Sequence, residues 1–340
     1  MIEFGSDFHY IDSYNSGGTS LADVFRGATL LADGRQCIVA LVRQYKWRRI
    51  WMPEYFCYEV IDHIKRNTDI EIVFYQDFPG HDEKSMLERL PYREGDVLFR
   101  MNYFGLRDKR DNSNICVPVI EDHSHDLTSI WAQESNADWC IASLRKSLPI
   151  PEGGMMWSPK GYSFLLNVKL TEENRKTANI RWNAMKKKSA YLLGASIRKE
   201  DFRKQYTMTE EWFDHADLSL IDKRSRKFIM QFDLGNWNKA KRDNWHLLKD
   251  IINKSYLYKP EADSCTPFQW VILLDSNNQR DIVRQKLITK DVYPSILWVV
   301  PKTVSREVKD ISGRILCIHC DGRYQKSIAI LAKILNETLS

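Results

Sequence analysis

The sequence predicts an α/β protein with a mostly parallel central sheet that helices cover on both faces. Between residues 34 and 144, segments with a helical spacing of apolar residues alternate with apolar runs of strand length. Parallel strands need crossover connections, which are usually helices, and sheets of this kind are buried on both faces. The length of 340 residues exceeds that of a typical domain, so a second, smaller domain is also expected.

The first half of the chain supplies the elements of this sheet. The segment 34–45 has the helical spacing of apolar residues and follows Asp33, a residue type that commonly caps helix starts. The next apolar run ends at Pro53, which favours a short strand that leads into a loop. The elements expected in order are a helix at 34–45, a strand at 49–53, a helix at 59–66, and strands at 70–75, 96–102, 116–121 and 139–144.

The pattern changes in the second half. From Thr171 onward the chain is rich in Lys, Arg, Glu and Trp at helical spacing, and a further helical stretch covers 218–253 with a break at Gly235. The tail returns to an α/β pattern, with strands at 268–274 and 315–319 and helices at 280–290 and 327–339. We therefore expect a large domain over 1–235, with a helical insertion at about 160–220, and a small C-terminal α/β domain over 236–340.

Composition excludes several classes of protein. Hydrophobic residues make up 43% of the chain and charged residues 28%, which excludes disorder and low complexity. The 50 basic and 45 acidic residues leave a net charge of +5, too small to indicate nucleic-acid binding. No apolar stretch approaches the roughly 20 residues that cross a bilayer, and the first residues do not form a secretory signal. Seven scattered cysteines favour reduced thiols, so we expect a cytoplasmic protein that binds neither nucleic acid nor membrane.

Motifs narrow the classes further. The chain has no G-x-G-x-x-G, no G-x-x-x-x-G-K-[ST] and no G-x-S-x-G, so nothing indicates a Rossmann dehydrogenase, a P-loop NTPase or an α/β-hydrolase. Cys317 and Cys320 have the spacing of half a zinc site, but no second pair of that kind follows. A buried strand end is the favoured interpretation of these two cysteines, and no metal site is expected there.

The densest polar cluster follows a predicted buried strand, over residues 119–126. Ligands of open α/β sheets bind at the carboxyl ends of strands. As a metal site, the cluster offers Asp122, His123, His125 and Asp126, but successive residues cannot all point at one ion. As a cofactor site, one carboxylate holds a cationic ring nitrogen, and His125 lies one helical turn further on. A polar turn with a capping aspartate is the structural alternative.

A second strand end carries a lysine. Lys146 follows the strand at 139–144 and precedes Glu152, Gly153 and Gly154. Most lysines are surface charges, but one that lies between two strand ends can form a Schiff base with an aldehyde cofactor. Such a lysine must be partly deprotonated, which burial and the neighbouring positive charge of Arg145 favour.

Together these segments resemble the DegT/DnrJ-type sugar aminotransferases. That family has an E-D-x-x-[QH] turn, a serine-containing strand, a lysine, and E-G-G shortly after it. The residues that match are Glu121-Asp122-His123-Ser124-His125, Ser143, Lys146 and Glu152-Gly153-Gly154, with further matches at Asp33-Gly34-Arg35-Gln36, Pro53-Glu54-Tyr55-Phe56-Cys57, Asn102-Tyr103-Phe104-Gly105, Val292-Tyr293-Pro294 and Cys320-Asp321-Gly322-Arg323-Tyr324. The resemblance covers roughly 25–157 and 220–335. It departs from the family at Ile141, where a serine is usual, and at His123, where a small residue is usual.

The resemblance implies a PLP-dependent transferase of fold type I and roles for particular residues. Lys146 would bind pyridoxal 5'-phosphate and then carry protons at the substrate, and Asp122 would pair with the protonated pyridine nitrogen, which keeps the ring an electron sink. His125 would lie near the 3-hydroxyl of the ring. The remaining expected contacts are Gly34, Arg35, Gln36 and Ser143 at the phosphate, and either Tyr55 or Phe56 on the ring face.

The resemblance also implies an activity. A member of this family would transfer an amino group from an amino acid, with glutamate as the expected donor, to a nucleotide-linked keto-sugar of polysaccharide biosynthesis, and would work as a homodimer. Three alternatives stay open at this point. They are a cofactor-binding regulator without turnover, a PLP-dependent sugar dehydratase, whose relatives typically carry histidine in place of Lys146, and a metal-dependent hydrolase that uses His123 and His125.

Overall fold

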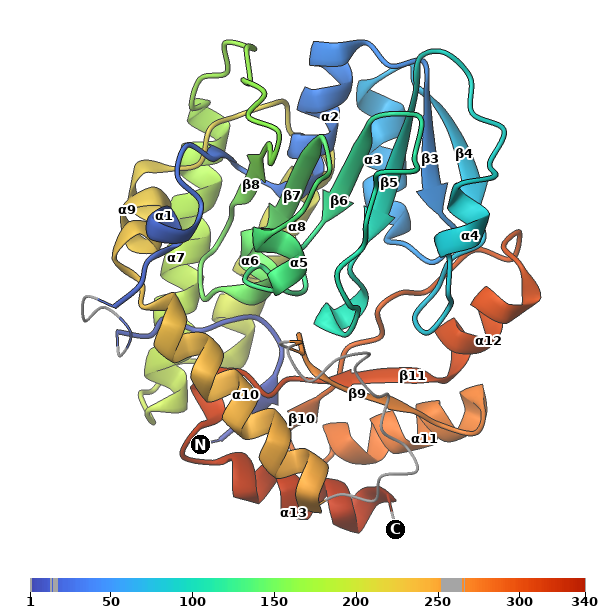
Figure 1. The fold of residues 1–340 in the computed structure, drawn as a ribbon. Coiled ribbons are helices and arrows are strands. Elements are labelled where there is room, and N and C mark those ends of the chain that lie inside the picture. Colours follow the sequence, from blue (N-terminus) through green and yellow to red (C-terminus); the bar gives the residue numbers. More distant parts are fainter. Residues whose placement is uncertain (1, 13, 15–17, 252–264, 266, 340) are drawn as a thin grey trace.

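Figure 1 shows an α/β unit built on a seven-stranded sheet, with a smaller α/β unit beyond the carboxyl ends of its parallel strands. The computed structural model describes residues 2–12, 14, 18–251, 265 and 267–339. The strand order is β2-β8-β7-β6-β5-β3-β4, in which β8 is antiparallel to both neighbours and every other pairing is parallel. The predicted fold class is confirmed. The strands are β2 Thr29–Leu31, β3 Arg49–Pro53, β4 Glu71–Tyr75, β5 Asp96–Met101, β6 Val119–Asp122, β7 Trp139–Ser143 and β8 Gly154–Trp157.

The central strands form where the sequence has buried apolar runs. Every residue of β3, β5, β6 and β7 is buried, as expected for parallel strands covered on both faces. The strand expected from residue 116 begins only at Val119, because Pro118 cannot donate a hydrogen bond to the ladder. The sequence did not predict β2 and β8, which are three and four residues long and too short for a periodic signal.

Helices cover the sheet as its parallel connections require. The helix α2, Gly34–Tyr45, coincides with the predicted range and is buried from Gly34 to Val42 against β7 and β8. The helix α3, Tyr58–Asn67, is one residue longer at each end than predicted. Short elements lie near the carboxyl ends of the strands: α4 Lys84–Leu87, η1 Tyr103–Gly105, α5 Ile130–Gln133 and α6 Leu144–Ser147.

The helical pattern predicted from Thr171 onward is confirmed, and the first residues of the expected insertion at about 160–220 are extended. Residues 161–171 lie in neither helix nor strand, and partly buried and exposed side chains alternate from Phe164 to Leu170. This is the two-residue period of an extended chain rather than a helical period. Helices start only at α7, Glu172–Leu192, which packs against α8, Lys199–His215.

The helical stretch predicted over 218–253 divides before Gly235. It forms α9, Lys223–Gln231, and α10, Leu234–Ile251, while residues 252 and 253 lie outside the described residues. The carboxylate of Asp233 accepts a hydrogen bond from the backbone N–H of Asn236 at 3.0 Å, so Asp233 starts α10 and Gly235 lies in its first turn. The proposed domain boundary at 235 and 236 falls in this turn and stays a prediction. The short α1, Leu21–Val24, packs against α9.

The C-terminal unit joins the two ends of the chain. Its strands β9, Trp270–Leu273, and β11, Ile315–Ile318, pair antiparallel, and β10, Val292–Tyr293, pairs in parallel with the N-terminal β1, Phe4–Gly5. The other elements are α11 Asn277–Ile288, α12 Arg306–Arg314, η3 Gly322–Tyr324 and α13 Ile328–Leu339. Within the described part of the chain, no helix combines the length and apolar character needed to cross a bilayer.

Candidate active site

A cavity of about 290 Å³ lies at the carboxyl ends of β6 and β7. Two strand ends and the start of α2 enclose it, and side chains of the C-terminal unit close it. Six of the nine predicted site residues line this cavity: Gly34, Arg35, Phe56, Asp122, Ser143 and Lys146. Tyr55, Gln36 and His125 are not among the residues that line it.

Glycines allow the close approach of three elements at this cavity. A Cβ at Gly34 would lie 2.8 Å from the Cβ of Ser143, and a Cβ at Gly154 would lie 2.2 Å from the backbone O of Asp33. Gly153 has a φ of +125°, which L side chains rarely adopt. The start of α2, the end of β7 and the start of β8 are therefore in direct backbone contact.

The turn after β6 is tied to the end of β7 by hydrogen bonds. The carboxylate of Asp122 accepts from the backbone N–H of Ser124 at 2.8 Å. The Ser124 hydroxyl in turn accepts from the backbone N–H of Ser143 at 2.7 Å. Ser124 also lines the cavity and was not a predicted site residue, although it stands inside the E-D-x-x-[QH] turn. These bonds fix the direction of the Asp122 carboxylate.

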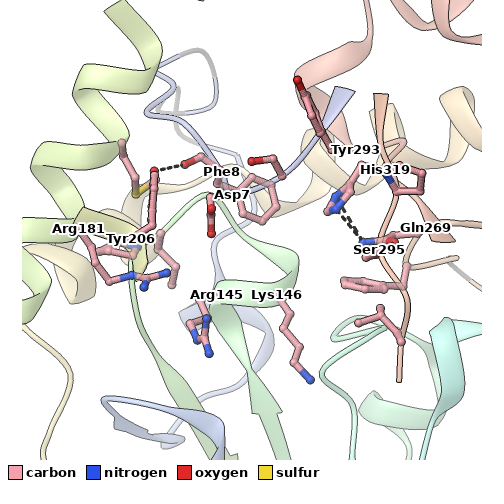
Figure 2. A pocket seen from close by; sticks show the side chains of 17 residues that line it. Asp7, Phe8, Arg145, Lys146, Arg181, Tyr206, Gln269, Tyr293, Ser295 and His319 are labelled. Atoms are coloured by element: carbon pink, nitrogen blue, oxygen red, sulfur yellow. Dashed lines mark hydrogen bonds between the residues drawn. The ribbon is translucent and has the colours of Figure 1, made fainter. Parts of the chain in front are cut away.

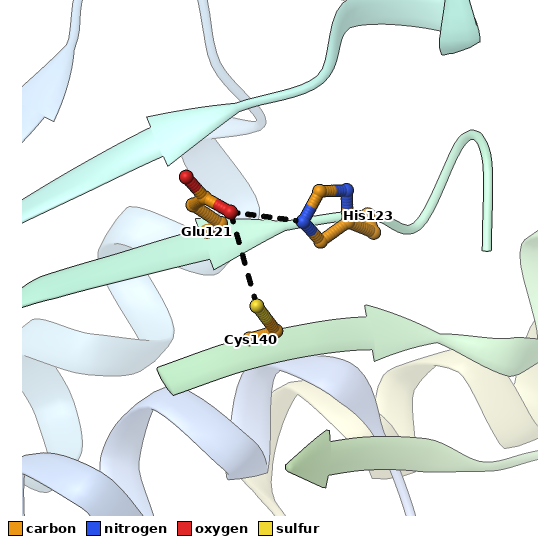
Figure 3. A group of neighbouring side chains, drawn as sticks. All are labelled: Glu121, His123 and Cys140. Carbon is orange, nitrogen blue, oxygen red and sulfur yellow. Dashed lines mark hydrogen bonds and ion pairs between the residues drawn. The ribbon is translucent and has the colours of Figure 1, made fainter. Parts of the chain in front are cut away.

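The side chains of Glu121 and His123, which flank Asp122 in the sequence, lie on the other face of the sheet. Figure 3 shows Glu121, His123 and Cys140 together, and their ligand atoms lie within 4.8 Å of one another. All three residues are fully buried. The Glu121 carboxylate is 3.2 Å from Nε2 of His123, and it accepts from Nδ2 of Asn112 at 2.7 Å and from the Ser135 hydroxyl at 2.6 Å. Burial acts to raise the pKa of Glu121, but these partners hold it below its ordinary value.

The metal interpretation of residues 122–126 therefore fails. Asp122 faces the cavity while His123 faces the Glu121 cluster, because side chains alternate along a strand. In the described part of the chain, Glu121, His123 and Cys140 are the one group of three His, Cys, Asp or Glu residues close enough to hold an ion. The Glu121 carboxylate of this group already accepts hydrogen bonds from Asn112 and Ser135.

His125 lies in a stack of aromatic rings. Its ring is nearly parallel to those of Phe104, Phe268 and Trp298, at centroid distances of 5.5, 4.4 and 5.4 Å. Nδ1 accepts a hydrogen bond from the backbone N–H of Phe104 at 3.0 Å. Burial, followed by the charges of Lys146 and Lys241, lowers the pKa of His125 well below its ordinary value, so the proton of the neutral ring is on Nε2. Nε2 has no partner among the described residues.

The side chains of two predicted contacts are engaged elsewhere. The Gln36 amide donates to the backbone O of Asp217 at 2.9 Å and accepts from the backbone N–H of Ser219 at 3.0 Å, so it anchors the chain at 217–219. The Tyr55 hydroxyl donates to the backbone O of Leu297. Of the two aromatic candidates for the ring face, Phe56 is the one that lines the cavity.

Lys146 stands between this cavity and a second one. It projects from α6, and its Nζ lies 5.2 Å from the ring centroid of Trp298. The second cavity, about 410 Å³, shares Arg145, Lys146 and Leu297 with the first (Figure 2). Arg145, whose charge was expected to act on the lysine, makes two hydrogen bonds to Glu210 at 3.0 and 2.6 Å, so much of that charge is compensated.

The start of α2 carries a mixture of charges. Asp33 caps the helix by accepting from the backbone N–H of Arg35 at 3.1 Å. The Arg35 guanidinium forms an ion pair with Asp214, and the Nε atoms of Arg35 and Arg145 lie 3.5 and 3.7 Å from the Asp33 carboxylate. The negative charge of Asp33 is thus offset by two arginines at the end of the cavity where the helix begins.

This architecture is similar to that of solved aminotransferases. A Streptococcus pneumoniae protein described as a sugar aminotransferase, solved in its PMP form, superposes with a TM-score of 0.66 at 11% identity, over 99% of this chain and 98% of that one. The Helicobacter pylori aminotransferase PseC, involved in the biosynthesis of pseudoaminic acid, gives 0.63 at 11% identity over 99% of both chains. The chain has the fold of these aminotransferases. The aminotransferase TlmJ of Streptoalloteichus hindustanus gives 0.59 at 11% identity, over 92% of this chain and 85% of that one.

Sequence comparison adds no closer relative. No protein-family model matches the sequence, and no curated protein matches it. At 10–12% identity the structural similarity establishes the fold, so an activity has to be argued from the side chains of the site.

Proposed function

We propose that the chain is a pyridoxal-phosphate-dependent aminotransferase that passes an amino group from glutamate to a nucleotide-linked keto-sugar. The observation that carries the proposal is that Lys146 and Asp122 line one cavity, at the ends of adjacent parallel strands, with the start of α2 on a third wall. A lysine amine, a carboxylate and a helix N-terminus suit the aldehyde, ring nitrogen and phosphate of this cofactor.

The groups in the cavity fit that cofactor. The start of α2 lies on the cavity wall, and the first-turn N–H groups that a helix leaves without intrahelical partners suit a phosphate, although Asp33 already accepts from that of Arg35. Arg35 and Arg145 offset Asp33 at the same end. His125 does not line the cavity, but its ring stacks on that of Trp298, which does.

Each residue then has a stated task. Pyridoxal phosphate, when bound, supplies an electron sink for the bond changes at the amino-bearing carbon. Asp122 would hold a proton on the ring nitrogen, and the Ser124 N–H keeps its carboxylate in place. Lys146 would bind the cofactor aldehyde and later carry a proton at the substrate carbon. Phe56, Leu297 and Trp298 line the cavity and would shield the bound cofactor from water.

The oligomeric state and location are part of the same proposal. The resemblance to sugar aminotransferases supports a cytoplasmic homodimer whose second copy completes the site. Light scattering on the purified protein at several concentrations would test this, and a mass of one chain at all of them would contradict it.

The amino-donor reaction tests the activity. Purified protein is loaded with pyridoxal phosphate, which should give a visible absorption band, and glutamate is then added without an acceptor. We expect the band to disappear and 2-oxoglutarate to form in an amount equal to the bound cofactor. Cofactor binding with no loss of the band for any amino acid would indicate a regulator without turnover, and a chain that binds no cofactor would refute the proposal.

A further inference from the structure

The second cavity has walls of different electrostatic character. Figure 2 shows Arg145 and Arg181 on one side and Gln269, Ser295 and His319 on the other. Burial lowers the pKa of His319, and its ring nitrogens lie 3.2 and 3.3 Å from Nε2 of Gln269, so this second wall is uncharged near neutral pH. A ligand with one anionic end would therefore orient that end toward the arginines.

Arg181 has unused hydrogen-bonding capacity on the cationic wall. It is 4% exposed, and its Nη1 donates to the Thr209 hydroxyl at 3.1 Å and to the Glu210 carboxylate at 3.2 Å. Among the described residues, its Nε has no hydrogen-bond partner, and the side chain lines the cavity. Burial and the positive charge of Arg145 lower the pKa of Arg181, against the opposing effects of Glu210 and Asp7. A buried guanidinium with free N–H groups is a strong donor to an anion.

Carboxylates offset part of the positive charge of this wall. Glu210 bridges the two arginines, and the Asp33 carboxylate lies 3.7 Å from Nε of Arg145, so a group with one negative charge suits the wall better than a group with two. A carboxylate carries one charge, whereas a terminal phosphate carries about −1.5 to −2 at neutral pH. The cavity volume of about 410 Å³ lies within the roughly 300–1,000 Å³ of sites for small molecules.

We infer that Arg181, with Arg145 beside it, binds a carboxylate of the substrate that enters this cavity next to Lys146. This assignment rests on the proposed function and extends it, because Arg181 then determines the preference for an acidic amino donor.

Asp7, on the segment that follows β1, weakens the binding of a carboxylate in this cavity. It lines the same cavity, is exposed, and forms no ion pair with either arginine among the described residues, so it repels the incoming carboxylate.

Calorimetric titration with glutarate tests the inference without turnover. Glutarate has two carboxylates and no amino group, so it can bind but cannot react. With cofactor-loaded protein, Arg181→Gln should weaken glutarate binding about tenfold or more, the usual cost of losing a hydrogen bond between charged groups. Arg181→Lys should retain part of the affinity, and Asp7→Asn should increase it. Arg175→Gln is the matched control, because Arg175 lies on the same helix with its side chain 56% exposed.

The outcomes separate this inference from the proposed function. The absorption spectrum first reports whether the cofactor has bound; if it has not, the proposed function fails, and the glutarate titration of that protein still tests Arg181. Equal affinity of wild type and Arg181→Gln would overturn the inference. A parallel titration uses uridine diphosphate. If Arg181→Gln weakens the binding of uridine diphosphate but not that of glutarate, the arginine binds a phosphate and the inference is overturned. Thermal unfolding of each variant shows whether Arg181→Gln is folded. If it is not, the inference is tested by the glutarate affinities of Asp7→Asn, expected to rise, and of Arg181→Lys, expected to fall only in part.

Discussion

Consecutive residues of the candidate site face different surroundings, and this limits what sequence alone can predict. Asp122 faces the cavity while Glu121 and His123 form a network on the other side of the sheet. Phe56 lines the cavity while the Tyr55 hydroxyl bonds to a backbone carbonyl. The direction of each side chain therefore depends on strand alternation and on distant partners, which the motif does not reveal.

At this scale Asp122 gives a direct prediction. Asp122→Asn should still bind pyridoxal phosphate, because the other walls of the cavity are intact, but amino transfer should fall on the order of 100-fold, since the amide cannot stabilise a proton on the ring nitrogen. Single-turnover kinetics with glutamate measure the effect. Asp138→Asn is the control, because Asp138 accepts from the backbone N–H of Val119 at the opposite end of β6. Near-normal turnover of Asp122→Asn would refute the ring-nitrogen assignment.

Elements were predicted well where periodicity extends over many residues. The range of α2 matches the structure, because its apolar positions repeat over three turns and Asp33 marks its start. The strands β2 and β8 were missed because they are only three and four residues long, and β2 also pairs with a strand far along the chain. The helical pattern predicted from Thr171 onward is confirmed, because α7 begins at Glu172 with Thr171 as its cap. Local sequence therefore predicts long elements, whereas short ones depend on tertiary contacts.

Glu152 links several elements and makes their stability depend on pH. Its carboxyl group accepts from the backbone N–H of Asp222, the residue that caps α9, at 2.7 Å. Burial raises the pKa of Glu152 from 4.5 to about 8. The folded state therefore retains a proton that the unfolded state loses, so the free energy of unfolding should fall as the pH rises from about 4.5 to about 8.

The Glu152→Gln variant isolates this contribution. The amide keeps the acceptor oxygen for Asp222 but cannot ionise, so thermal unfolding of the variant should depend less on pH between 5 and 8, a range set by the raised pKa of about 8. The difference from wild type should be largest at the alkaline end. Parallel unfolding curves of the two proteins across this range would show that Glu152 does not titrate there.

At the scale of the whole molecule, the sequence predicted the class of fold, and six of the nine predicted site residues line one cavity. Alternating helices and strands, followed by polar residues at two strand ends, were sufficient for that. The second cavity was not predicted, because its walls come from the N-terminal segment, α7, α8 and the C-terminal unit. Nothing in the sequence distinguishes Arg181 from the many other basic residues at helical spacing.

The most direct test of the central claim is to locate the cofactor on the chain. The protein is incubated with pyridoxal phosphate, reduced with borohydride and digested, and the modified peptide is identified by mass spectrometry. We predict one reduced cofactor per chain, on Lys146, and none on that peptide in Lys146→Ala. Lys160→Ala, on an exposed lysine paired with Asp138, should label like wild type. Failure to label Lys146, or stoichiometric labelling of a different lysine, would contradict the account.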